Sequence, residues 1–258
     1  MIMSPEDIQE LGIAKGFLEN LSIAAKITNK IGIPIEKGFN LLPNDWREKI
    51  GNATRNTLMI ALKSALYTMD FETKQASPLL HKIAAVASGS VGGAFGLPAL
   101  LIELPISTTI ILRSIADIGR AHGEELKTAE VRIACLEVFA FGGTSNIDDS
   151  SESGYFAVRG ALARVVTEAS EYLTEKTIVE ESVPALIRLI SVIAARFQVQ
   201  VSEKAAAMAV PLIGAIGGGT INYLFMEHFQ NISRGHFIVR KLERKYGNNL
   251  VRKTYEKL

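Results

Sequence analysis

The sequence holds a single cysteine, Cys135, among 258 residues. One thiol cannot close an internal disulfide, which fits a reducing compartment. The first residues, MIMSPEDIQE, also lack the basic region and the apolar run of a secretory signal peptide. We therefore expect a cytoplasmic protein.

The short motifs of the common enzyme classes are absent as well. There is no HExxH zinc motif and no GxSxG nucleophile elbow, and the glycine-rich run ASGSVGGAFG lacks the GKS or GKT ending of a phosphate-binding loop. We expect neither a metal site nor a cofactor. The groups that could still meet in space as acid, base or metal ligand are His122, Glu124, Glu227, His228 and His236. Such groups are more often surface residues or helix caps, so enzymatic activity is the less favoured interpretation.

Neither sign of charge dominates, because 28 lysines and arginines face 27 acidic residues for a net charge of +1. Affinity for nucleic acid grows with the number of cations that displace counterions from phosphates. Aromatic residues also do not interleave with the basic ones in a stacking pattern. Nucleic acid is therefore not an expected partner.

Alternation of the kind that marks strands is missing, whereas apolar residues recur with a helical period along the chain. We predict an all-α protein, with residues 1–258 forming a single domain of roughly eight helices around a central glycine-rich helical pair. Ser4 and Pro5 mark the start of a first helix with Asp7 in its first turn, and Gly123 is placed to end a later one. Along the first helix, Glu10 and Lys15 are expected to face water.

Two stretches carry no charge for about 20 residues, the length at which a core helix is hard to distinguish from a membrane span. They run from Ile83 to Ile102 and from Ala205 to Met226. Glycines four residues apart would lie on one helix face and allow close helix packing, in a soluble core or in lipid. A core is the favoured interpretation, with a hairpin that becomes exposed at a membrane as the alternative. The glycines concerned are Gly89, Gly92, Gly93, Gly96, Gly214 and Gly218.

Polar residues within or beside these stretches need partners if they are buried. They are Glu103, Arg113 and Asn222. We predict that Glu103 pairs with a cation, either Arg113 or one from the C-terminal helix, and joins the two apolar stretches. The alternative is that Glu103 faces water at a helix break between Pro98 and Pro105. For Asn222 we expect a hydrogen bond across a helix crossing.

The C-terminal segment is basic, with eight lysines and arginines against two glutamates in residues 234–258. Basic residues beside an apolar segment are attracted to an anionic cytoplasmic leaflet. An ordinary amphipathic surface helix is the alternative explanation. The residues expected to meet anionic headgroups are Arg234, Arg240, Lys241, Arg244 and Lys245.

Three segments carry a resemblance to a known family: GIPIEKGFNLLP, GGAFGLPALLIELPISTTIILRSIADIGRAHGEE and PLIGAIGGGTINYLFMEHFQNISRGHFIVRKLERKYG. Together they resemble the EcsC family over about residues 25–247, and the polar loop at 145–153 is the least family-like part. The founding member is encoded beside the subunits of an ABC transporter, so the resemblance implies an association of that kind and no established reaction.

These observations favour a non-enzymatic accessory protein that is peripheral to the inner face of the cell membrane. Its expected partners are the anionic membrane surface and the subunits of an ABC transporter. Two alternatives stay open. One is a hydrolase or metal-dependent enzyme that uses the histidines and acids, and the other is a soluble lipid-binding module with an apolar cavity.

Overall fold

The computed structural model describes residues 2–19, 22–31, 36–68, 97–142, 154–175 and 183–258. These residues form ten α-helices and one short 3-10 helix and contain no strand, so the all-α prediction is confirmed. In chain order the elements are α1 (Pro5–Leu18), α2 (Ile23–Ile31), α3 (Glu36–Phe39), α4 (Trp46–Thr68), α6 (Leu97–Ala121), α7 (Ala129–Glu137), η1 (Val138–Ala140), α8 (Gly154–Glu175), α9 (Pro184–Ala209), α10 (Pro211–Tyr246) and α11 (Asn248–Tyr255).

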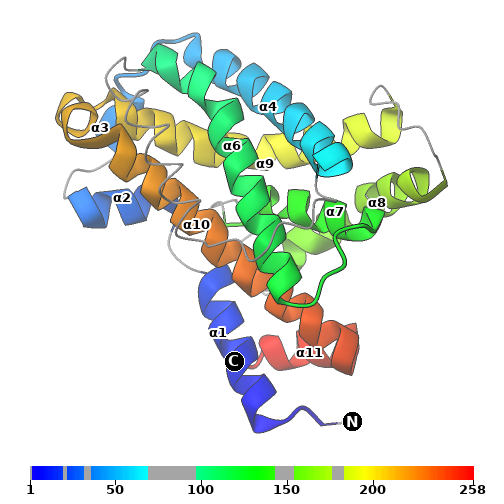
Figure 1. The fold of residues 1–258 in the computed structure, drawn as a ribbon. Helices are drawn as coiled ribbons and strands as arrows, with labels where there is room; N and C mark the ends of the chain where they lie inside the picture. The colour runs from blue at the N-terminus through cyan, green and yellow to red at the C-terminus, as the bar shows by residue number, and fades with distance from the viewer. Residues whose placement is uncertain (1, 20–21, 32–35, 69–96, 143–153, 176–182) are drawn as a thin grey trace.

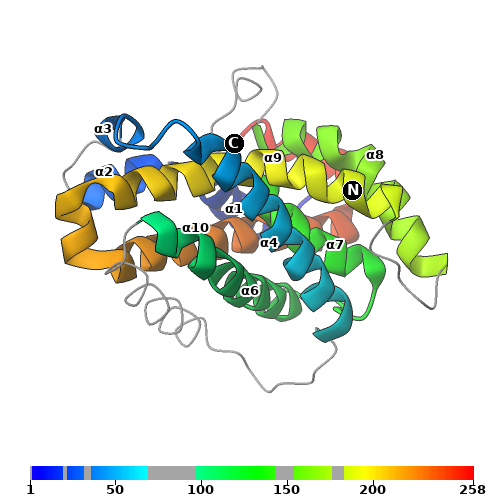
Figure 2. The same ribbon diagram turned by 90° about the horizontal axis from the view of Figure 1, so that it is seen from above.

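Three long helices, α6, α9 and α10, form the frame of the molecule (Figures 1 and 2). Helices α9 and α10 form an antiparallel hairpin that turns just before Pro211, and α4 packs on both α6 and α9. Helix α6 runs in the same direction as α10. Near the start of both helices Asn222 binds Glu103, and near the end of α6 Gly119 lies against Phe237.

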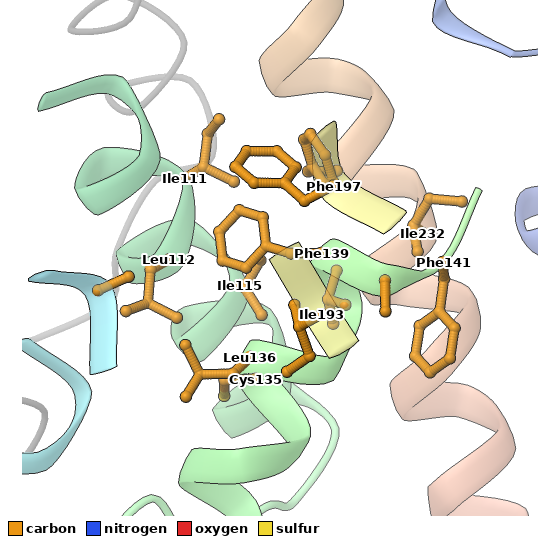
Figure 3. Packing of buried hydrophobic residues seen from close by; sticks show 14 of the residues in the cluster. Ile111, Leu112, Ile115, Cys135, Leu136, Phe139, Phe141, Ile193, Phe197 and Ile232 are labelled. Carbon is orange, nitrogen blue, oxygen red and sulfur yellow. The ribbon is translucent and has the colours of Figure 1, made fainter. Parts of the chain in front are cut away.

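The centre of the core is built around the short helix η1 (Figure 3). Phe139 of η1 lies between Ile111 and Ile115 of α6 and Phe197 of α9. Its ring centroid is 5.0 Å from that of Phe197 and 5.2 Å from that of Phe229 on α10. These separations are typical of favourable aromatic pairs. The chain after α7 therefore supplies the residue that joins all three long helices.

Helix α1 begins as its sequence predicts. The Ser4 side chain accepts a hydrogen bond from the backbone N–H of Asp7, and Pro5 occupies the first turn, where no N–H is needed. At the far end of α6, Gly123 adopts a φ of +80°, which confirms the predicted stop. These ends are fixed by local chemistry.

The side of α1 that is predicted to face water is partly covered, because the helix packs against α10 and α11. Glu10 forms an ion pair with Lys241, whose Nζ lies 2.8 Å from a carboxylate oxygen. Lys15 donates to the backbone carbonyl of Tyr255 at 3.2 Å. The expectation that both side chains face only water is therefore wrong, since a neighbouring helix supplies partners that periodicity cannot show.

The alternative of a helix break between Pro98 and Pro105 is also wrong. Helix α6 runs without a break past Pro98 and Pro105. Pro98 lies in its first turn, where the missing N–H costs nothing, and Pro105 removes only the bond to the carbonyl of Leu101. Helix α10 begins at Pro211, and the described residues form ten α-helices where the sequence predicts roughly eight. The packing of long helices outweighs one lost hydrogen bond.

Some predictions fall outside the described residues. These are the glycine rows before Leu97 and the polar loop at 145–153. Gly214 and Gly218 lie within α10, but their packing belongs to the part that is not described. The glycine-zipper interpretation therefore stays a prediction.

We expect Gly235→Ala to lower the free energy of unfolding by roughly 1–3 kcal/mol, the usual cost of overpacking. A Cβ at this position in α10 would lie 2.6 Å from Leu18 Cγ and 2.8 Å from the Ala14 carbonyl oxygen of α1. Urea denaturation followed by circular dichroism measures the change.

Gly160→Ala in α8 is the matched control, because nothing lies within 4 Å of an added Cβ there. It should stabilise the protein by about 0.5–1 kcal/mol through helix propensity. Equal effects of the two substitutions would contradict a tight α1–α10 contact.

Candidate functional site

A buried ion pair lies where α6, α9 and α10 meet. The Nζ atom of Lys204 on α9 lies 2.9 Å from Oε2 of Glu103 on α6. The side-chain amide of Asn222 on α10 donates to Oε1 of the same carboxylate, also at 2.9 Å. Each of the three long helices thus contributes one polar group to a single contact.

The surroundings of this ion pair are apolar. Lys204 is fully buried and Glu103 is 6% exposed. The Lys204 ammonium also lies over the ring of Phe225, 4.7 Å from its centroid, which is a cation–π distance. Charges this deeply buried are tolerated only when they are paired and hydrogen-bonded. The contact therefore fixes the register of α6 against the α9–α10 hairpin.

The predicted pairing of Glu103 is present, with a different cation from those expected. Arg113 lies on the exposed side of α6, so placing it among the buried polar residues is wrong. Asn222 makes the predicted bond across a helix crossing. The idea that Glu103 faces water at a helix break is also wrong, because the helix continues and buries it.

The opposite side of α6, here called the outer face, consists of Pro98, Ile102, Pro105, Ile106, Thr109 and Arg113. Ile102 is 75% exposed and Ile106 is 54% exposed. The outer face carries no charge before Arg113. Among the described helices, α6 and α9 are long and apolar enough to cross a membrane by length and composition alone. Helix α6 therefore has an apolar outer face and a buried inner face, on which the Glu103 carboxylate binds Lys204 and Asn222.

The basic residues of α10 have partners within the protein. Arg240 binds Glu124 and Glu130, and Arg244 binds Glu124 and the carbonyl of His122. The remaining members of the predicted headgroup-binding set are also engaged: Lys241 with Glu10, Lys245 with Asp7 and Arg234 with Asn231. Contact of these residues with lipid stays a prediction, and each must share or leave an internal partner to achieve it.

The side chains of His122 and Glu124 bind different partners. Burial on its own would raise the pKa of Glu124, but hydrogen bonds from Arg240 and Arg244 outweigh it and hold the pKa below its ordinary value. The Nδ1 atom of His122 lies 2.8 Å from the carbonyl of Ile118. Glu124 thus serves as the acidic partner of two arginines.

His228 and His236 lie on α10 and are both fully buried. Eight residues of helix separate them by about 12 Å. Nδ1 of His228 lies 3.3 Å from Lys26 Nζ, whereas Nδ1 of His236 lies 2.9 Å from the Tyr155 hydroxyl. Burial and the nearby Lys26 ammonium lower the pKa of His228 to about 3. Burial, with help from nearby arginines, also lowers the pKa of His236 well below its usual range. Both rings are neutral, and they face different helices.

Two acidic side chains respond to burial in the opposite sense. Burial raises the pKa of Glu137 on α7 to about 7, with partial compensation by Arg159. Burial raises the pKa of Glu203 on α9 to about 7, against the effect of a hydrogen bond from the Ala24 backbone N–H. Both carboxyl groups are therefore partly protonated near neutral pH.

The described part of the chain brings together no group of three or more metal-ligating side chains. Cys135 is buried, and burial raises the pKa of its thiol far above the usual range. A polar groove of 520 Å³ lies between α4 and α9, lined by residues that include Asn44, Arg47, Arg55 and Gln198. Charged and amide side chains in its walls make this groove unlike the apolar cavity that a lipid-binding module requires.

Comparison with known proteins identifies the family. The model of the EcsC protein family matches residues 8–242, nearly the whole chain. The chain belongs to the EcsC protein family. No curated protein and no solved structure matches the chain significantly. The predicted resemblance over about residues 25–247 is confirmed, and the EcsC match also includes most of α1.

In this EcsC protein, the sequence did not lead us to predict Lys204 as the partner of Glu103. Lys204 directly precedes the uncharged stretch from Ala205 to Met226, just as Glu103 directly follows the one that ends at Ile102. Opposite charges at the borders of two apolar stretches were the signal that could have indicated the pair.

We expect Glu103→Gln to destabilise the protein by about 3–5 kcal/mol, because it leaves Lys204 charged and without an anionic partner in the core. Combining it with Lys204→Met should recover most of that loss. Thermal and urea unfolding measure both variants.

Glu125→Gln, at an exposed position shortly after α6, is the control and should change stability by less than about 0.5 kcal/mol. Unfolding of the Glu103 variant at the wild-type midpoint would mean that the ion pair is not required.

The buried groups also predict how stability depends on pH. As pH falls below 6.5, His228 and His236 become protonated in the unfolded state but stay neutral in the folded state. The free energy of unfolding therefore decreases. Between about pH 7 and 4.5, Glu137 and Glu203 bind protons mainly in the fold, so stability is gained. The two effects oppose each other down to pH 4.5. Below it, the lowered pKa values of Glu124 and Asp7 add to the histidine effect, because these carboxylates bind protons mainly in the unfolded state.

The free energy of unfolding should therefore change little from pH 7 to 4.5. Below pH 4.5 it should fall by at least about 1.4 kcal/mol per pH unit for each buried histidine, because the carboxylates of lowered pKa add to the loss. Urea titrations at pH 7, 5.5, 4.5 and 3.5 test this. Glu203→Gln removes one compensating group, so its stability should already fall between pH 6.5 and 4.5. A wild-type protein that loses stability steeply in that interval would contradict the assignment.

Proposed function

We propose that this EcsC protein acts as an accessory protein at a membrane surface, where the outer face of α6 contacts lipid. The observation that carries the proposal is the pair of exposed isoleucines, Ile102 and Ile106, one helical turn apart on a face that carries no charge before Arg113. Single exposed apolar residues are ordinary in soluble proteins, but apolar residues repeated along one helix face mark an interaction surface.

The order of residues along this face suits the interface of a bilayer. Pro98, Ile102 and Ile106 come first, and the exposed Arg113 follows about two turns after Ile106. An amphipathic helix that lies on a membrane buries its apolar side chains while its basic side chains reach the headgroups. We therefore place the N-terminal half of α6 in the interface, parallel to the surface.

Basic residues of α10 offer a second contact. Lys241, Arg244 and Lys245 have side chains that are 44%, 45% and 55% exposed. They lie about 30 Å along α10 from Asn222, and hence from the apolar half of α6. Anionic lipid would favour this end, so we place the protein on the cytoplasmic leaflet. We also propose that the protein associates with an ABC transporter, on the basis of the resemblance to the EcsC family alone.

The enzymatic alternative has weaker support. His228 and His236 are buried against different helices, and the Glu124 carboxylate is already bound by two arginines. A catalytic acid or base needs a partner within hydrogen-bond reach and access to a substrate. The lipid-binding alternative needs an apolar cavity, and the groove between α4 and α9, whose lining includes charged and amide side chains, does not supply one.

Vesicle flotation tests the proposal. Ile102→Asp with Ile106→Asp should weaken binding to phospholipid vesicles about ten-fold or more, because each isoleucine contributes roughly 1–2 kcal/mol of apolar transfer. Helical content and the unfolding midpoint should stay close to wild type, since both side chains are exposed.

The matched control is Ile187→Asp with Val199→Asp on α9, at positions that are 45% and 38% exposed. Binding of the control should equal that of wild type. Binding that disappears at high salt and survives the α6 substitutions would shift the contact to the basic residues of α10. No binding to neutral or anionic vesicles under any condition would refute the membrane proposal.

A further inference from the structure

Three segments of low charge converge at one end of the molecule. In α6 the only charged residue before Arg113 is Glu103, and α10 has none between Pro211 and Met226. The last residues of α9, after Lys204, are likewise uncharged. Because α6 runs parallel to α10 while α9 is antiparallel to it, the start of α6, the end of α9 and the start of α10 lie together (Figure 2).

Among the described residues of this apolar end, Glu103, Lys204 and Asn222 form a buried polar link between α6 and the α9–α10 hairpin. The neighbouring inner face of α6 is apolar or hydroxyl-bearing, with Leu100 and Leu104 fully buried. Apolar contacts of this kind exchange readily for contacts with lipid chains, which are equally apolar. A buried ion pair does not exchange in this way, because separating it leaves two charges without partners.

We infer that the Glu103–Lys204 ion pair is a latch that keeps the inner face of α6 on the α9–α10 hairpin while the outer face contacts lipid, and so limits how deeply α6 enters the membrane. This inference rests on the membrane proposal above and deepens it. When the ion pair is formed, α6 lies on the membrane surface. When both charges are removed, the inner face of α6 can leave the α9–α10 hairpin and contact lipid chains instead. Asn222 holds the second carboxylate oxygen and restricts the geometry in which the pair forms.

Depth-dependent fluorescence quenching tests the latch in the full-length protein. Ile102→Trp in a Trp46→Phe background places the only tryptophan on the outer face of α6. Vesicles contain phospholipids brominated either close to the headgroup or close to the bilayer midplane. With the ion pair intact, we expect quenching by the shallow bromines only.

Neutralising the pair with Glu103→Gln and Lys204→Met should increase quenching by the midplane bromines several-fold. Exchanging the charges, with Glu103→Lys and Lys204→Glu, should restore shallow quenching because an ion pair is again present. Glu103→Gln with Lys204→Gln is a second neutral pair in case the methionine variant does not fold. Circular dichroism confirms that each variant retains its helices.

The outcomes separate the two ideas. Shallow quenching in both the intact and the neutral protein would overturn the latch and leave the membrane proposal standing. Deep quenching with the pair intact would also overturn the latch. Absence of quenching by either lipid in every variant would mean that α6 does not meet the membrane, and both ideas would fall together.

Discussion

The contact among Glu103, Lys204 and Asn222 is the constraint on which the rest of the arrangement depends. Two charges in an apolar setting must stay together, so α6 can take only one register against the α9–α10 hairpin. That register decides which residues of α6 are buried and which form its outer face. The contact that pairs the buried charges therefore also turns Ile102 and Ile106 toward solvent.

The other end of the molecule is held by ion pairs that range from buried to exposed. Helix α10 has 36 residues, so it extends about 54 Å beyond its start. Near its end, Arg240 and Arg244 bind Glu124 just after α6, while Lys245 binds Asp7 of α1. These pairs connect α10 to both neighbours and reduce the net positive field of the C-terminal segment. The two ends of the frame thus differ: one is apolar with a buried ion pair, and the other is charged and partly exposed.

Sequence reasoning succeeded where the chemistry is local. Ser4 and Gly123 mark helix ends through bonds and backbone angles within a few residues, and both are confirmed. The need of Glu103 for a partner also followed from its apolar neighbours. Its partner did not, because Lys204 lies 101 residues away and only the packing of α9 brings it close. For the same reason the sequence could not show that the basic residues of α10 face acids of α1 and of the segment after α6.

Site-directed spin labelling of α6 tests the central claim most directly. Nitroxides at Ile102, Ile106 and Thr109 would report collision with oxygen, which concentrates in lipid, before and after vesicles are added, while the buried Cys135 stays unlabelled. The account predicts a rise at these three positions and none at Val192 and Val199 on the exposed side of α9. An unchanged signal on α6 with bound vesicles, or an equal rise on α9, would contradict it.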